Sequence, residues 1–225
     1  MSHILSIETA TKTCSIALHD NGHLITCQDL HVAQSHAESL MAMIQHTLAI
    51  SRCNKKDLAA IAVSTGPGSY TGLRIGASTA QGLGYALRIP LIAVNTLYAM
   101  AHSIVPYNHQ QAFLCPMIDA RRMEVYCLVT DPQGKILAAP HPHIVHSDSF
   151  ATWLARGPVL FFGDGAAKCQ GILAHQPQSI FLEDMHPSAK YVGEVAYQKF
   201  QKKDFTAVDG FTPTYLKAFQ ERAAN

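Results

Sequence analysis

The sequence feature that most constrains the fold is a repeat of strand and turn signals in the two halves of the chain. Glu8 and Asp119 each end a β-rich run, and they are 111 positions apart. Asp20 and Asp131 each open a turn, again 111 positions apart, and a glycine and an apolar run follow each turn. Later in each half an apolar run leads into a glycine pair, "AVSTGPG" and "LFFGDGA", before helical sequence. The repeat predicts a duplicated unit of strands and helices, with a chance likeness between two β-hairpins as the alternative.

The duplication predicts an α/β protein with mixed sheets flanked by helices. The boundary is expected near Pro106–Gln111, so that residues 1–106 form an N-terminal half and residues 107–225 a C-terminal half. Strands are expected near 3–8, 13–19, 23–29, 59–64, 91–94, 112–118, 124–130 and 158–162. Helices are expected near 36–50, 72–88, 96–104, 148–155, 166–174 and 188–202. Two facing halves create a cleft, into which Glu8 and Asp119 should point.

Composition narrows the class of protein. Apolar residues make up 48% and charged residues 15% of the 225 residues, which is typical of a globular chain with a core. The net charge of +1 excludes a strongly basic surface of the kind that binds nucleic acid by itself. The six cysteines are scattered without a CxxC pair, and no apolar run has membrane-spanning length. These features predict a soluble cytoplasmic protein with free thiols and no membrane partner.

A glycine-containing loop between residues 66 and 72 opens the helix expected at 72–88. The loop lacks the spacing and the lysine of a P-loop, and Thr71 stands where a dinucleotide fingerprint needs glycine. In the helix, small residues recur every fourth position and therefore share one face: Gly72, Gly76, Ala80 and Gly84. Such a stripe indicates close approach of another backbone. That backbone can be the chain's own sheet or a helix of another subunit, and the sequence leaves both open.

Other side chains give weaker signals. The helix expected at 36–50 has more apolar residues than one buried face needs, which favours a partner surface. Thirteen histidines occur without an HExxH motif, so no metal site is predicted. Arg121, beside Asp119, is a candidate for contacting an anion in the cleft.

A set of motifs in order along nearly the whole chain resembles one family. The motifs are "ILSIETATKTCSIALHDNG", "HAESL", "GPGSYTGLRIG", "IPLIAVNTLYAMA", "DARRMEVY", "GDGA" and "FTPTYLK". Together they resemble the bacterial TsaB (YeaZ) family, which is related to the glycoprotease M22 proteins. The resemblance implies two ribonuclease-H-like halves of the actin/Hsp70-like ATPase superfold.

The resemblance also implies a function. Such a chain is a non-catalytic scaffold that dimerises with the catalytic paralogue TsaD, recruits the ATPase TsaE and self-associates in isolation. The complex would transfer a threonylcarbamoyl group to adenosine 37 of tRNAs that read ANN codons. The chain would therefore contact tRNA through the complex. Thr96 and Met100 stand where the paralogue has the two histidines of an HxxxH metal pair, which argues against metal and catalysis in this chain.

The residues that the resemblance assigns fall into two groups. The expected partner interface comprises His36, Leu40, Met43, Ile44, Gly72, Leu73, Gly76, Ala80 and Gly84. The expected cleft comprises Glu8, Asp119, Arg121, Gly163 and Gly165. It should hold no tightly bound cofactor and bind ATP or ADP at most weakly. The alternative functions are a small-molecule kinase or ATPase of the same superfold and, ranked last, a metal-dependent glycoprotease.

Overall fold

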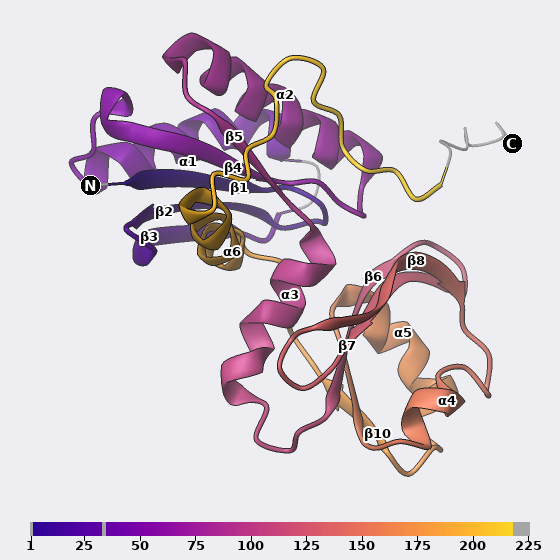
Figure 1. Cartoon of the computed structure of the whole chain (residues 1–225). Helices are drawn as coiled ribbons and strands as arrows, with labels where there is room; N and C mark the ends of the chain where they lie inside the picture. Colours follow the sequence, from indigo (N-terminus) through magenta and orange to yellow (C-terminus); the bar gives the residue numbers. More distant parts are fainter. Residues whose placement is uncertain (1, 33–34, 218–225) are drawn as a thin grey trace, which may run out of the picture.

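Two five-stranded mixed sheets with the same topology form the framework of the computed structural model, which describes residues 2–32 and 35–217 (Figure 1). The first sheet has the order β3-β2-β1-β4-β5, and the second has the order β8-β7-β6-β9-β10. In each sheet the first three strands are antiparallel neighbours, and the first, fourth and fifth are parallel. The prediction of a duplicated α/β fold is confirmed.

The strand bounds follow the predicted runs closely. The first sheet consists of β1 (His3–Glu8), β2 (Cys14–Asp20), β3 (His23–Leu30), β4 (Leu58–Ser64) and β5 (Leu91–Val94). The second consists of β6 (Phe113–Asp119), β7 (Glu124–Thr130), β8 (Ile136–Ile144), β9 (Val159–Phe162) and β10 (Ser179–Leu182). The list of expected strands lacks β8 and β10. Pro140 and Pro142 lie within β8, which is possible because β8 is an edge strand and need not donate every amide to a neighbour.

The helices are α1 (His36–Ile50), α2 (Tyr70–Leu87), α3 (Thr96–Ile104), α4 (Ala151–Leu154), α5 (Asp164–Leu173) and α6 (Ala189–Gln201). Short 3-10 turns at Lys55–Asp57 and Val105–Tyr107 precede β4 and β6. The bounds of α1 and α3 are those predicted, whereas the helix expected at 148–155 is the single turn α4. No helix within the described residues is both long and apolar enough to cross a bilayer.

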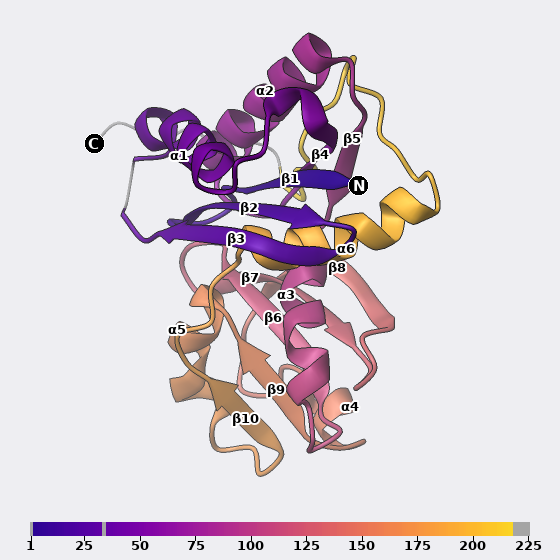
Figure 2. The same cartoon turned by 90° about the vertical axis from the view of Figure 1, so that its left-hand side faces the viewer.

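The helices form three layers around the two sheets (Figure 2). Helices α1 and α2 cover one face of the first sheet, and α6 covers its other face. Helix α3 packs on one face of the second sheet, and α4 and α5 lie on the opposite face. Because α3 also packs against α6, these two helices fill the space between the sheets.

Each helix of this central layer, α3 and α6, packs on the sheet of the other half of the sequence. Helix α6 packs on strands of the first sheet, although a boundary at residue 106 assigns it to the C-terminal half. Helix α3 precedes that boundary but packs on β6 and β7 of the second sheet. The division into residues 1–106 and 107–225 therefore separates the two sheets but not the helices that cover them.

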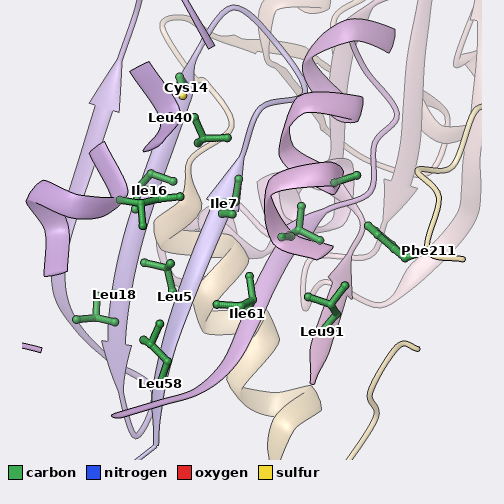
Figure 3. Packing of buried hydrophobic residues seen from close by; sticks show 14 residues of the cluster. Leu5, Ile7, Cys14, Ile16, Leu18, Leu40, Leu58, Ile61, Leu91 and Phe211 are labelled. Atoms are coloured by element: carbon green, nitrogen blue, oxygen red, sulfur yellow. The ribbon is translucent and has the colours of Figure 1, made fainter. Parts of the chain in front are cut away.

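The first sheet is apolar on both faces because helices cover both. Leu5 and Ile7 of β1 point into the cluster beneath α1 and α2, together with Leu40 (Figure 3). Ile4, one position out of phase, packs with Val192 of α6 on the other face. Alternation of side chains along a strand thus produces two separate cores from one continuous apolar run.

A segment after α6 returns across the first half, and we name residues 205–217 the C-terminal strap (Figure 1). The Thr206 amide donates to the Leu91 carbonyl at 2.9 Å, so the strap covers the free edge of β5. The Gln81 side chain of α2 donates to the Val208 carbonyl at 3.1 Å. Phe211 then enters the core cluster under α2 (Figure 3). The strap therefore closes the side of the first half at which α2 and β5 meet.

Gly193 on α6 should be essential for the central layer. A Cβ at this position would overlap the imidazole of His19 and lie 2.8 Å from the Ser6 hydroxyl, and both of these side chains are fully buried. We expect Gly193→Ala to lower the free energy of unfolding by about 1–3 kcal/mol, because the buried ring must move. The matched control is Gly171→Ala on α5, where the added Cβ meets open space. The control should raise stability by about 0.5–1 kcal/mol, and urea unfolding compares the two.

Candidate functional site

The stripe of small residues on α2 faces the chain's own first sheet. A Cβ at Gly72 would overlap the Thr9 carbonyl, and one at Gly76 would overlap the Thr9 hydroxyl. A Cβ at Gly84 would lie 3.1 Å from the Leu91 side chain, and Ala80 is fully buried. Of the two explanations that the spacing left open, packing on the chain's own sheet is the one that holds. The expectation that a partner helix docks on this stripe is wrong.

The rest of the predicted interface is also mostly internal. Three of its apolar members are no more than 1% exposed: Leu40, Ile44 and Leu73. His36 is buried, and its Nε2 lies 2.9 Å from the Thr11 carbonyl, where it links α1 to the loop after β1. Met43 is half-buried against the core. The residues chosen from the sequence therefore hold α1 and α2 in place, and they do not form the surface of these helices.

The accessible surface of α1 and α2 is the opposite side of both helices, which lie side by side in Figure 2. We define the outer face by its exposed residues: Ala37, Glu38, Met41, Ala42, Gln45, His46, Ala49 and Ile50 of α1, and Thr71, Arg74, Ser78, Gly82, Tyr85 and Ala86 of α2. The face is rich in small and apolar residues. Met41 is 44%, Ile50 53% and Tyr85 76% exposed.

The outer face has a small-residue stripe of its own. Ser78, Gly82 and Ala86 recur every fourth residue on α2, and a Cβ at Gly82 would meet nothing within 4 Å. Glycine within a helix costs about 0.5–1 kcal/mol relative to alanine. No contact within the described chain requires glycine at this position. The stripe could have been found from the sequence, since its spacing equals that of the inner stripe.

Glu8 does not point into an open cleft. Its carboxyl is fully buried, and Oε1 accepts hydrogen bonds from the Ala10 amide at 2.6 Å and the Ser64 hydroxyl at 2.9 Å. Oε2 has no hydrogen-bond partner in the described part of the chain. Burial raises the pKa of the Glu8 carboxyl to about 7, because desolvation of the charge outweighs the two hydrogen bonds. The prediction that Glu8 lines the cleft is therefore wrong.

Asp119 lies at the end of β6, but local groups already engage it. It forms an ion pair with Lys168, and its Oδ1 accepts a hydrogen bond from the Arg121 amide at 2.8 Å. The Lys168 ammonium also donates to the Glu124 carbonyl at 2.6 Å. The Asp119 amide donates to Asp164 at the start of α5, at 3.0 Å. Asp119 thus stabilises the turn between β6 and β7, while the Arg121 side chain is exposed.

Gly163 and Gly165 permit close contact between α5 and β6. A Cβ at Gly163 would overlap the Met117 carbonyl, and one at Gly165 would lie 2.9 Å from the Ile118 carbonyl carbon. The hollow beside Gly163 has a volume of about 190 Å³, below the roughly 300 Å³ of ordinary ligand sites. It is lined by Gly163, Ala166, Ala167, Gln170, Phe181, Leu182, Glu183 and Asp184. These glycines therefore allow close packing of α5 on β6. Of the expected cleft residues, Asp119, Gly163 and Gly165 lie together in the second half, and Glu8 lies apart from them in the first.

The two positions at which the paralogue has the histidines of its HxxxH pair lie in α3. Thr96 and Met100 are both buried, and Met100 packs in the core between α3 and the second sheet. Within residues 2–32 and 35–217, no three His, Cys, Asp or Glu side chains are arranged to hold a metal ion. The hydroxyl of Thr96 and the thioether of Met100 therefore cannot act as the two imidazole ligands of an HxxxH pair.

The sequence is 31% identical to the tRNA threonylcarbamoyladenosine biosynthesis protein TsaB of Escherichia coli (strain K12), over 95% of this chain and 94% of that protein. The chain belongs to the TsaB family. The TsaB protein of Bacillus subtilis (strain 168) is 28% identical over 98% of this chain and 96% of that protein. The family model for TsaD, tRNA N6-adenosine threonylcarbamoyltransferase, matches residues 30–222, so TsaB-type and TsaD-type chains are related in sequence.

Solved structures agree with this membership. YeaZ is the other name of the TsaB family, and a Pseudomonas aeruginosa crystal structure described as similar to peptidase YeaZ has a TM-score of 0.80 at 28% identity. The alignment covers 96% of this chain and 100% of that one. An activator of 2-hydroxyisocaproyl-CoA dehydratase from Clostridium difficile, with a TM-score of 0.53 and 8% identity, shares the fold alone. The resemblance to TsaB and the duplicated actin-like fold are both confirmed.

The buried carboxyl of Glu8 should leave a signature in the pH dependence of stability. Its pKa is about 7 in the folded state, against 4.5 for the free side chain. Protonated Glu8 therefore favours folding at low pH, and this contribution is lost as the pH rises through about 7. We expect the stability of Glu8→Gln relative to wild type to increase by up to about 3 kcal/mol between about pH 4.5 and pH 8. Urea unfolding over this range measures the difference, and a difference independent of pH would contradict the raised pKa.

Proposed function

We propose that this TsaB-family chain is a non-catalytic subunit of the machinery that makes tRNA threonylcarbamoyladenosine. In this proposal the assembled complex transfers a threonylcarbamoyl group to adenosine 37 of tRNAs that read ANN codons, in the cytoplasm. Family membership supports the pathway. The non-catalytic role is supported by Thr96 and Met100, which cannot act as the two imidazole ligands of an HxxxH pair.

The chain's own contribution is to dock the catalytic paralogue TsaD on the outer face, and the resulting dimer recruits the ATPase TsaE. In the absence of the paralogue, a second copy of the chain takes its place. The observation that carries this proposal is Gly82, an exposed helical glycine with open space above it, in a stripe flanked by the exposed Tyr85. A shallow groove between exposed apolar side chains lets another helix approach closely. The docking surface is therefore the outer face, and the buried stripe that begins at Gly72 only supports it.

Substitution of Gly82 tests the docking surface. We expect Gly82→Leu to weaken binding of the paralogue by about 100-fold, because the leucine fills the groove at the centre of the contact. The monomer should stay folded, since a Cβ at this exposed position meets no atom of the described residues within 4 Å. Gly171→Leu is the matched control, with the same change at an open helical glycine on α5. Titration calorimetry and gel filtration measure the affinity of both variants for the paralogue. Wild-type affinity in Gly82→Leu would contradict the proposal.

The rival function is a small-molecule kinase or ATPase of the same superfold, and a metal-dependent glycoprotease ranks below it. We expect only weak binding of ATP or ADP with magnesium, with a Kd above about 0.1 mM. Glu8 is buried, Asp119 is held by Lys168, and the backbone of β6 occupies the space beside Gly163. Calorimetry with magnesium ATP measures this affinity. Micromolar binding would favour the kinase or ATPase.

A further inference from the structure

Two tyrosines hold Arg74 of the outer face in one orientation. Its guanidinium carbon lies 4.4 Å from the ring centroid of Tyr70, which is a cation–π contact. Its Nε donates a hydrogen bond to the Tyr215 hydroxyl at 3.4 Å. The rings of Tyr70 and Tyr215 also contact each other, with centroids 4.8 Å apart. The two tyrosines come from α2 and from the C-terminal strap, so this arrangement joins segments 141 positions apart in sequence.

The strap fixes Tyr215 by contacts on both sides of it. The Thr214 amide donates to the Thr65 carbonyl at 2.8 Å, in the loop that opens α2. The Lys217 ammonium reaches the Glu124 carboxylate on β7 at 2.5 Å. These contacts anchor Tyr215 to both halves of the molecule, and its hydroxyl is therefore a positioned acceptor for Arg74.

An arginine held in one orientation, with terminal donors that no described residue binds, is suited to recognition. An unrestrained arginine loses side-chain entropy when it is immobilised, whereas stacking and the Nε bond restrain Arg74 in advance. No other hydrogen bond of Arg74 is formed with the described residues, and its side chain is exposed. The terminal N–H groups of a guanidinium match the two oxygens of a carboxylate. Arginine and tyrosine are also enriched among the residues that dominate binding energy in protein interfaces.

The charges around Arg74 favour a protein carboxylate over nucleic acid. The ionisable side chains on the outer face, apart from its exposed tyrosine, are Glu38, His46 and Arg74. Binding to a phosphate backbone needs several lysines or arginines on one surface, and one arginine beside a glutamate does not provide that. We propose that Arg74 anchors the TsaD-type subunit by binding an aspartate or glutamate carboxylate of that subunit, with Tyr215 as the positioning residue. This inference rests on the proposed docking function.

The experiment measures the affinity for the paralogue, by calorimetry at low and high salt, for three variants of the full chain, beside a control variant and Gly82→Leu. Arg74→Glu should weaken binding by about 100-fold, because it sets two carboxylates against each other. Arg74→Lys should weaken it by about tenfold, since lysine keeps the charge but loses the planar geometry. Tyr215→Phe keeps the ring and removes the acceptor, and should weaken binding severalfold. Binding of Arg74→Glu should no longer weaken as the salt concentration rises, whereas Arg74→Lys, which keeps the charge, should retain the salt dependence of wild type.

Arg156→Glu is the matched control, because Arg156 is likewise exposed and stacked on aromatic rings, those of Phe113 and Trp153, but lies outside the outer face. It should bind the paralogue as wild type does. Wild-type affinity in Arg74→Glu, with binding lost in Gly82→Leu, would overturn the anchor and leave the docking surface standing. Wild-type affinity in both variants would overturn the docking surface as well. Retained paralogue binding with weaker tRNA binding by the complex would assign Arg74 to nucleic acid and also overturn the anchor.

Discussion

The contact between α2 and the loop after β1 determines the geometry of the first half. Gly72 and Gly76 have no side chain where the backbone and hydroxyl of Thr9 lie, so the helix rests directly on the end of the strand. The Ser69 amide, at the N-cap of α2, donates to the Ala10 carbonyl at 2.6 Å and fixes the start of the helix at this point. With its inner side engaged in this way, α2 has only its outer side available for another molecule. Glu8, which ends β1 directly before this loop, is fully buried.

Most of the fold could be predicted from the sequence, since it depends on local patterns. The bounds of α1 and α3 follow from apolar periodicity. Helix α3 also begins at a capping residue, Asn95, whose side chain accepts a hydrogen bond from the Tyr98 amide. The duplicated topology follows from turn signals at equal separation. The long-range arrangement could not be predicted, because nothing local in the sequence of α6 says that it packs on the first sheet. The prolines of β8 obscured that strand for a physical reason, since only an edge position tolerates them.

The residues predicted for the partner interface lie on the buried sides of α1 and α2, whereas the docking surface that we propose is the exposed side of the same helices. Small residues every fourth position indicate close approach, but this spacing does not say what approaches. On α2 the pattern occurs twice, and burial distinguishes the covered stripe at Gly76 from the open one at Gly82. The residues expected to form the nucleotide cleft are likewise in contact with their own chain. Gly163 and Gly165 accommodate the chain's own backbone, and the carboxyl groups of Glu8 and Asp119 already have partners within their own halves.

The exchange of helices between the halves has a consequence for the order in which the chain is made. The strands of the first sheet are complete at Val94, but α6, which covers one face of that sheet, begins at Ala189. The strap that protects the edge of β5 follows later still. During synthesis, the segments that cover this face of the first sheet and the edge of β5 therefore become available only after the strands of the second sheet have been made.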